Sequence, residues 1–236
     1  MSQFVALTDV GHRKSTNEDA VLTRSLDDCH LLVVADGMGG HAAGDVASES
    51  AVNTILDVVL DQIDNETAYE QLLVGAVESA NKRIQQKAEE NPEQTDMGTT
   101  VVAAIVEDNK ASIVNVGDSR AYDIGDSFEQ ITVDQSLVQE LVEAGELTEE
   151  EAKDHPQSNI LSQAVGTTDE LDPDTYTREL DGTLLLCSDG LTDKVPEERI
   201  QDIVTQSADL DQRAMKLIEV ANEIDGSDNV SVVLYE

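Results

Sequence analysis

Four short apolar runs, each beside an aspartate, constrain the fold of this chain more than any other feature. The runs cover residues 31–35, 113–117, 184–188 and 230–234. Short apolar runs of this kind are typical of buried strands. The aspartates follow the first three runs and precede the last one: Asp36, Asp118, Asp189 and Asp228. We therefore expect four buried strands with a carboxylate at one end of each.

Glycines next to these aspartates indicate that the chain turns sharply there. Asp36 opens a glycine-rich loop at residues 37–40, and Gly190 follows Asp189. Glycine adopts turn conformations that strain other residues, so the carboxylates are predicted to gather in one cluster. Gathered carboxylates repel one another, and a hard divalent cation is the usual remedy. Since no His or Cys pair has zinc spacing, the pattern favours an enzyme that binds Mg²⁺ or Mn²⁺ through oxygen atoms.

The charge of the chain is extreme. Fifty acidic residues against fourteen Lys and Arg residues give a formal net charge of −36. Such a surface repels nucleic acid, whose binding needs clustered cations. Because the Debye length falls to about 3 Å in 1 M salt, concentrated salt would screen this self-repulsion, and we expect a halophilic host. An acidic interaction protein is the alternative, but it would not explain the aspartates at the strand ends.

Length and hydropathy favour one cytoplasmic domain. A chain of 236 residues is long enough for one good-sized core. No apolar run has the length of a membrane span, and the first residues lack the pattern of a signal peptide. Cys29 and Cys187 both lie in or beside apolar runs, where we expect buried free thiols. We expect a cytoplasmic monomer that contacts neither membrane nor nucleic acid.

The order of the predicted elements favours an α+β fold. Strands are predicted at residues 4–8, 20–22, 31–35, 100–106, 111–116, 121–124, 129–132, 175–180, 183–187 and 229–234. Apolar stripes predict one helix around residues 52–60, a second around 73–84 that ends near Asn91, and further helices at 196–206 and 209–224. Close strand spacing favours antiparallel hairpins covered by paired helices. The polar, mostly helical segment 135–158 is predicted to project as a flap.

Six short motifs in order resemble one family. The chain is similar to the metal-dependent serine/threonine protein phosphatases of type 2C (PPM) in their compact bacterial and archaeal form. The motifs that carry this resemblance are Thr8-Asp9-Val10-Gly11 with Asn17-Glu18-Asp19, Asp36-Gly37-Met38-Gly39-Gly40-His41, Gly98-Thr99-Thr100, Val116-Gly117-Asp118-Ser119-Arg120, Ser188-Asp189-Gly190-Leu191-Thr192-Asp193 and Ser227-Asp228-Asn229. Together they span nearly the whole chain.

The resemblance implies both a fold and a reaction. The fold is a four-layer α/β/β/α sandwich, in which two antiparallel sheets are flanked by helix pairs. Residues 1–236 would form a single catalytic domain with a flap at about 135–158. The reaction is the hydrolysis of phosphoserine and phosphothreonine on phosphorylated proteins, by a water molecule that a binuclear Mg²⁺ or Mn²⁺ centre activates.

The resemblance also assigns roles to individual residues. Asp36, Asp189 and Asp228 would be the catalytic carboxylates, with Asp36 bridging two metal ions. The Gly37 carbonyl would complete the first metal site, while Asp189 and Asp228 would hold the second. Glu18 would contact water bound to metal.

A third, weaker metal site and the phosphate ligand follow from the same resemblance. Asp118 and Asp193 would form the third site together with Asp189. The family's phosphate-binding arginine stands three residues after the glycine of the first motif, where this chain has Lys14 and places Arg13 one residue earlier. Lysine offers a point charge instead of a two-pronged fork, so either Lys14 or Arg13 could bind the phosphate.

The proton donor and three rival functions stay open. Met38 stands where animal members of the family carry a histidine, and His41 and His155 are the candidate proton donors. The flap motif 155–159 lacks the arginine of the family pattern. The rivals are a phosphatase-like regulatory or binding protein without turnover, an acidic interaction protein, and a two-metal enzyme for small phosphate esters.

Overall fold

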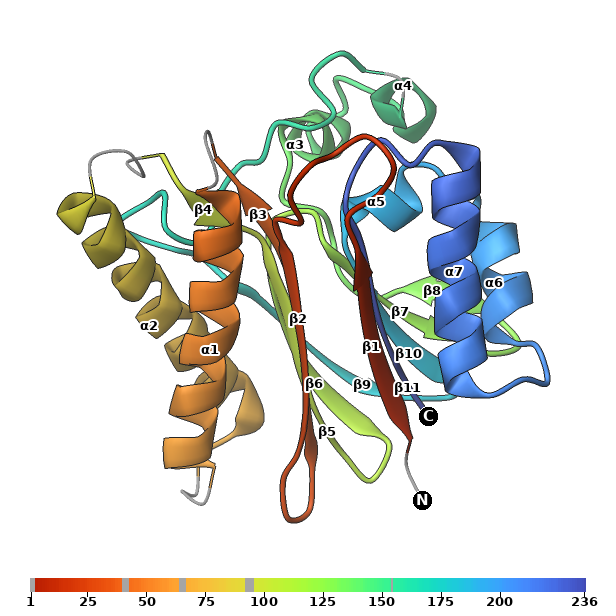
Figure 1. Ribbon diagram of the computed structural model, residues 1–236, viewed down its shortest axis with the longest axis horizontal. Helices are drawn as coiled ribbons and strands as arrows, with labels where there is room; N and C mark the ends of the chain where they lie inside the picture. The colour runs from red at the N-terminus through yellow and green to blue at the C-terminus, as the bar shows by residue number, and fades with distance from the viewer. Residues whose placement is uncertain (1–2, 40–42, 64–66, 92–95, 154) are drawn as a thin grey trace.

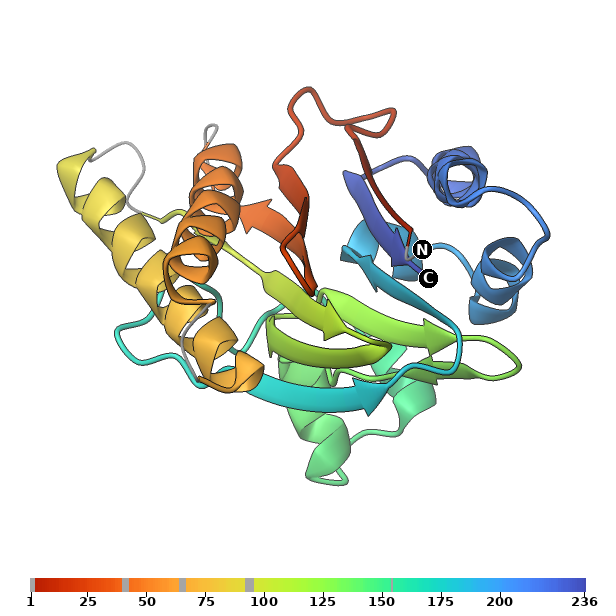
Figure 2. The same cartoon turned by 90° about the horizontal axis from the view of Figure 1, so that it is seen from below.

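A computed structural model describes residues 3–39, 43–63, 67–91, 96–153 and 155–236. Two antiparallel sheets stack face to face, with one helix pair outside each sheet (Figure 1). This arrangement confirms the predicted four-layer α/β/β/α sandwich. Seen from below, the sheets lie between the two helix pairs, and the chain termini are close together (Figure 2).

Two antiparallel sheets form the middle of the sandwich. In the first, the order is β1 (Phe4–Asp9), β11 (Val230–Tyr235), β10 (Thr183–Cys187), β7 (Arg120–Ile124) and β8 (Phe128–Gln130). In the second, it is β2 (Asp19–Ser25), β3 (His30–Met38), β5 (Val101–Glu107), β6 (Lys110–Val116) and β9 (Asp174–Glu179), and β4 (Gly98–Thr99) also pairs with β3.

The helices fall into two covering pairs and three short helices. Against the second sheet lie α1 (Gly44–Gln62) and α2 (Tyr69–Glu90), and against the first lie α6 (Glu197–Val204) and α7 (Leu210–Ile224). The short helices are α3 (Leu137–Glu143), α4 (Glu149–Lys153) and α5 (Asp189–Thr192). None of the helices in the described residues is both long and apolar enough to cross a membrane.

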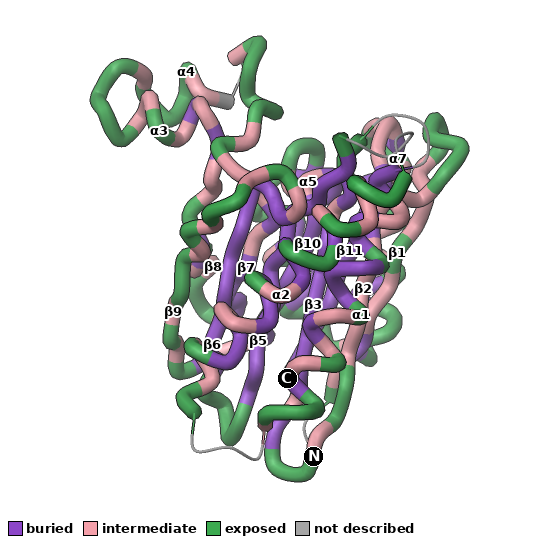
Figure 3. The backbone as a smooth tube through the Cα atoms, turned by 90° about the vertical axis from the view of Figure 1, so that its left-hand side faces the viewer, coloured by how far each residue is buried: buried purple, intermediate pink, exposed green. Residues whose placement is uncertain are grey.

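Apolar side chains alternate between the two faces of the central strands, and they form three apolar cores. On β3, Leu31 and Val33 face α1 and α2, whereas Leu32 and Val34 face the other sheet. The strand β10 alternates in the same way between the helix-facing core and the core between the sheets. Successive side chains of a strand point to opposite faces, so strands with helices on one face and a sheet on the other read as continuous apolar runs. Figure 3 shows that the central strands are buried along most of their length.

Several local predictions need correction. Asp36 does not end its strand, because β3 continues through Met38 by pairing with β4. Leu60 was expected on the buried stripe of α1 but is 44% exposed. The segment from Asp189 to Thr192, read as a turn, is the short helix α5. The predicted strand 129–132 is shorter and lies at Phe128–Gln130.

One edge of the sandwich collects the residues that the sequence singled out. The strands β1, β3 and β10 end at this edge, and their antiparallel neighbours β2, β7 and β11 begin there (Figure 1). The flap with α3 and α4 lies beside the same edge (Figure 1). Its ends pair at Ser136 and Leu161, slightly beyond the predicted boundary at 158.

Candidate active site

Asp36 and Asp189 form the centre of a carboxylate cluster at this edge. Asp36 lies on β3, and Asp189 begins α5 directly after β10. Each of the two carboxyl groups influences the pKa of the other, and the charges of Asp118 and Asp228 act on Asp189 as well. Four chain segments that lie far apart in the sequence therefore approach one another at this edge.

The backbone of Asp36 is held by two threonines. Its N–H donates to Thr100 Oγ1 over 3.0 Å, and its carbonyl accepts from the Thr100 N–H and from Thr99 Oγ1. Thr100 Oγ1 also pairs with Ser119 Oγ over 2.7 Å, which links Asp36 to the residue after Asp118. The motif 98–100 thus has a clear structural purpose, because it fixes the strand that carries Asp36.

Gly37 stands where no side chain would fit. A Cβ atom at this position would lie 2.1 Å from the carbonyl oxygen of Gly44 and 2.4 Å from that of Glu18. The Gly37 N–H donates to the Glu18 carbonyl over 3.1 Å. Close backbone approach between β3, the start of α1 and the end of the β1–β2 loop therefore explains this glycine.

Asp19 is a member of the cluster that the sequence analysis missed. It is the direct partner of Asp36 across the β2–β3 ladder, and it is only 7% exposed. Asp19 Oδ2 accepts from Ser188 Oγ over 2.8 Å, while the buried Oδ1 has no hydrogen-bond partner. The sequence places Asp19 directly before the predicted strand 20–22, but only the strand register reveals that it stands opposite Asp36.

Crowding raises the pKa values of these carboxyl groups. Loss of contact with water is the main cause, and the neighbouring carboxylates add to it. The pKa of Asp189 rises to about 8, and those of Asp19 and Asp118 rise to about 6. The pKa of Asp36 also rises well above its usual value. Without a cation, the cluster therefore retains protons at neutral pH.

Glu18 and Asn229 join the loop before β2 to the start of β11. The Glu18 N–H donates to Asn229 Oδ1 over 2.8 Å, and Asn229 Nδ2 donates to the carbonyls of Val10 and Thr16. Asn229 is 3% exposed. Sequence reasoning quoted Asn229 in a motif without a role, and the structure shows that it fixes the loop that carries Lys14.

Lys14 and Arg13 point to different carboxylates. Lys14 Nζ lies 2.7 Å from Asp228 Oδ1, and this hydrogen bond is the main reason that the pKa of Lys14 is raised. Arg13 NH2 lies 3.4 Å from Asp225 Oδ1 instead. Of the two candidate phosphate ligands, Lys14 is thus the one in direct contact with a predicted metal ligand.

The donor set fits a hard divalent cation. Every side chain in the cluster offers carboxylate oxygen, the atom that Mg²⁺ and Mn²⁺ prefer. The buried and unpartnered Asp19 Oδ1 is an acceptor that a metal-bound water could satisfy. Within the described ranges, no three His, Cys, Asp or Glu side chains already surround a single point. The fit of the cluster to a divalent cation therefore rests on its carboxylate oxygen donors and on the repulsion between them.

The family follows from comparison of the whole sequence. The sequence model of the family described as protein phosphatase 2C matches residues 10–220. The chain belongs to the protein phosphatase 2C family.

Two bacterial phosphatases align with nearly the whole length of this chain. The serine/threonine phosphatase stp of Listeria welshimeri is 41% identical over 235 residues, which span 97% of this chain and 93% of the relative. The protein phosphatase PhpP of Streptococcus pneumoniae is 40% identical over 235 residues, or 97% and 94% of the two chains. The prediction of an enzyme of the serine/threonine phosphatase class is thereby confirmed.

Solved structures confirm the fold of the phosphatase. The serine/threonine phosphatase PstP/Ppp of Mycobacterium tuberculosis matches with a TM-score of 0.90 and 37% identity, over 100% of this chain and 98% of the other. The catalytic domain of PstP in complex with two manganese ions matches with a TM-score of 0.87 and 35% identity, over 100% and 97%. In that relative, manganese is bound.

Hydrogen bonds join the base of the flap to the residue before Asp118. Asp118 follows Gly117, whose N–H donates to Gln135 Oε1 and whose carbonyl accepts from the Gln135 N–H, both over 2.9 Å. The base of the flap is thus tied to the residue before Asp118. Asp193 is exposed at the end of α5, and its charge acts on both Asp118 and Asp189.

The candidate proton donors receive little support. His155 Nδ1 accepts from the Gln157 N–H over 3.2 Å, a contact within the flap. His41 lies outside the described residues, and Met38 is 39% exposed at the end of β3. The identity of a proton donor therefore stays a prediction.

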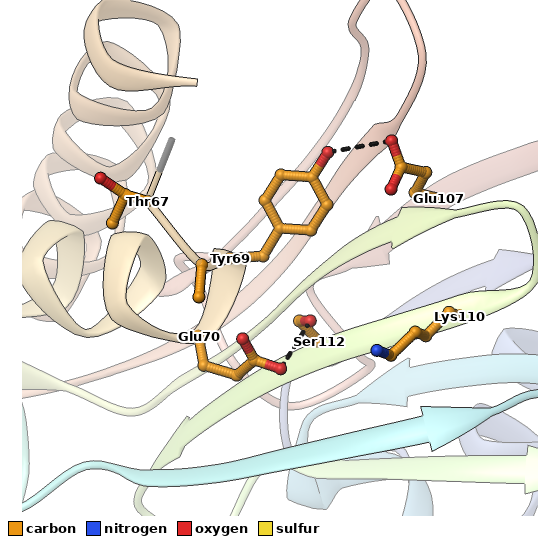
Figure 4. Close-up of a pocket in the computed structure, with 7 residues that line it drawn as sticks. Thr67, Tyr69, Glu70, Glu107, Lys110 and Ser112 are labelled. Carbon is orange, nitrogen blue, oxygen red and sulfur yellow. Dashed lines mark hydrogen bonds between the residues drawn. The ribbon is translucent and has the colours of Figure 1, made fainter. Parts of the chain in front are cut away.

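A cavity lies at the end of the second sheet remote from Asp36. It has a volume of about 250 Å³ and is lined by residues 67–70 and by side chains at the β5–β6 turn (Figure 4). Tyr69 donates to Glu107, and Ser112 donates to Glu70. Glu107 and His30 mark the end of the sheet remote from Asp36. The cavity contains none of the predicted site residues.

Stability without metal should fall as the pH rises. The folded-state pKa of Asp189 is about 8 against an ordinary value of 3.8, so the folded protein binds more protons than the unfolded one between these values. We expect the metal-free melting temperature to drop by several degrees from pH 5.5 to pH 8. Asp189→Asn should flatten this dependence in calorimetry at constant salt.

The matched control is Asp57→Asn, an equal change of charge on the exposed face of α1. This variant should keep the pH dependence of the wild type, because general charge repulsion is the same in both. A flat wild-type profile, or equal slopes for Asp189→Asn and the wild type, would contradict the pKa assigned to Asp189.

Proposed function

We propose that the chain hydrolyses phosphoserine and phosphothreonine esters of proteins with the help of Mn²⁺ or Mg²⁺. The observation that carries this proposal is that Asp36 pairs with the buried Asp19 across the β2–β3 ladder, and that Ser188, the residue before Asp189, donates to Asp19 at the edge that also holds Lys14. Carboxylates that lie close together repel one another, and a bound cation relieves this repulsion. The same cation would attract the negatively charged phosphate group of an ester. Residues 1–236 would act as one catalytic domain, with residues 135–158 as its flap.

Two ions, and a weaker third, would be held by the cluster. We assign Asp36 and the Gly37 carbonyl to the first ion, and Asp36, Asp189 and Asp228 to the second. Asp118 and Asp193 would join Asp189 at the third. When bound, the ions would supply a water of lowered pKa and offset the charge of the phosphoryl oxygens.

The remaining residues position these groups. Glu18 and the buried Asp19 would accept hydrogen bonds from water in the site, and Asp19 has an acceptor atom to spare. Lys14 would hold the phosphate as a point charge. Its contact with Asp228 places it nearer to the predicted ions than Arg13, which pairs with Asp225.

The burial and raised pKa values of both cysteine thiols favour direct attack by water over attack by a cysteine. Burial raises the pKa of Cys187 to about 12, and Cys187 is fully buried. The pKa of Cys29 is raised for the same reason, and this residue is 3% exposed. Because the thiolate is the nucleophilic form, neither cysteine suits a covalent phospho-enzyme route.

The expected partners are phosphorylated proteins. The relatives from Listeria and Streptococcus, a serine/threonine phosphatase and a protein phosphatase, support this class of substrate. The net charge of −36 supports the proposal that the enzyme acts at high salt concentration in a halophilic host. A cytoplasmic location and a monomeric state stay predictions.

Asp36→Asn should abolish catalysis. Removing the carboxylate that we assign to both main ions should lower kcat on a phosphothreonine peptide with Mn²⁺ by at least about 100-fold. The measurement is phosphate release at saturating Mn²⁺, and EDTA should stop the wild-type reaction reversibly. Asp57→Asn on the exposed face of α1 should keep wild-type turnover. Full activity of Asp36→Asn would refute the proposed site.

Lys14→Ala should weaken substrate binding more than Arg13→Ala. A charged hydrogen bond to phosphate is worth about 1.5–3 kcal/mol, so we expect KM to rise by about 10- to 100-fold for Lys14→Ala. Lys14→Arg should restore binding, because a guanidinium can replace the ammonium charge. Steady-state kinetics on a phosphothreonine peptide without other charges would show which of the two residues binds the phosphate. A larger rise in KM for Arg13→Ala would reverse the assignment.

Activity on phosphopeptides should increase with salt. Between about 0.1 M and 1 M KCl the Debye length falls from about 10 Å to about 3 Å, which screens repulsion between this chain and an anionic peptide. We expect kcat/KM to rise over this range. Circular dichroism at each salt concentration would separate this effect from unfolding at low salt. Highest activity at the lowest salt with a folded protein would contradict the halophilic interpretation.

A further inference from the structure

Asp225 holds two cations beside the candidate active site. Arg13 NH2 lies 3.4 Å from its Oδ1 atom, and Lys194 Nζ lies 4.0 Å from its Oδ2 atom. The Ser227 hydroxyl donates to the same carboxylate. Arg13 comes from the β1–β2 loop and Lys194 from the end of α5, so two separate segments bring positive charge to one carboxylate.

The loop that carries Asp225 is locked against the β1–β2 loop. The N–H groups of His12 and Arg13 both donate to the Gly226 carbonyl, over 2.8 Å and 3.1 Å. Gly226 has a φ of +59°, and a Cβ atom there would lie 2.9 Å from the His12 ring. The backbone position of Arg13 is therefore fixed, although its side chain is 69% exposed.

Positive charge is scarce in this chain, which makes its location informative. Among fourteen Lys and Arg residues, Arg13, Lys14 and Lys194 all contact the single loop 225–228. Lys14 pairs with Asp228, whereas Arg13 and Lys194 share the single carboxylate of Asp225, so three cations contact two carboxylates of this loop. On a strongly acidic molecule such a spot focuses attraction for anions.

We propose that Arg13 and Lys194 form a second anion subsite next to the phosphate position. This inference rests on the proposed function and narrows its substrate class. The preferred substrates are phosphopeptides that carry another negative group, a carboxylate or a second phosphate, close to the phosphorylated residue. Asp225 positions both cations for this contact.

The separation of Asp225 and Asp228 limits the distance between the phosphate position and the second anion subsite. Asp225 and Asp228 are three residues apart, which corresponds to at most about 10 Å of extended chain. A substrate in extended conformation covers that distance in about three residues. The second negative group should therefore lie one to three residues from the phosphothreonine.

Matched peptides test the preference directly. We would compare phosphothreonine peptides with glutamate or glutamine two residues before or after the phosphothreonine. The assay uses saturating Mn²⁺ and the lowest salt at which circular dichroism shows a folded protein. The readout is the ratio of kcat/KM for the glutamate peptide to kcat/KM for the glutamine peptide. This ratio cancels any change in the hydrolytic step itself.

The wild type should favour glutamate on at least one side. Arg13→Gln and Lys194→Gln should each lower that ratio by about two- to fivefold, the range expected for exposed charge pairs. Lys216→Gln is the control, because Lys216 pairs with Glu219 on α7 and not with loop 225–228. It removes the same charge and should leave the ratio unchanged.

The outcomes separate this inference from the proposed function. A wild-type ratio of one or less on both sides overturns the subsite. So does a wild-type preference that survives in the double variant of Arg13→Gln and Lys194→Gln. Absence of turnover on every phosphopeptide with Mn²⁺ contradicts the proposed function instead.

Discussion

Repulsion between carboxylates gathered at one sheet edge is the constraint on which the rest of this structure depends. Asp36 and Asp189 influence each other's charge, and burial together with the neighbouring carboxylates raises the pKa of both. An arrangement of this kind costs stability unless protons or cations occupy it. The two stacked sheets offset that cost, because their strands are paired and their three apolar cores are buried.

The surroundings of the cluster explain how it stays in place. Thr100 and Thr99 hold the backbone of Asp36, while Asn229 ties the β1–β2 loop to the start of β11. These contacts use neutral donors that do not cancel the negative charge of the site. These neutral contacts fix the backbone around Asp36 without pairing its carboxylate with a cation, so this carboxylate can exchange a proton for a metal ion.

Much of the fold could be predicted because β3 and β10 are buried on both faces and read as continuous apolar runs. The carboxylates at strand ends were recognisable for the same reason. Asp19 was not, since its place opposite Asp36 depends on strand register, which a single sequence does not encode visibly. The salt bridge from Lys14 to Asp228 was equally hidden, because it joins loops from opposite ends of the chain. The helix α5 is too short for a periodic pattern.

Calorimetric titration with Mn²⁺ tests the central claim most directly. The protein is titrated at pH 7 in two buffers of different ionisation enthalpy, which reports the protons released on binding. The account predicts saturable binding with proton release, and loss of both in Asp189→Asn. Absence of binding at millimolar Mn²⁺, or binding without proton release, would contradict the view that this cluster holds protons in place of metal ions.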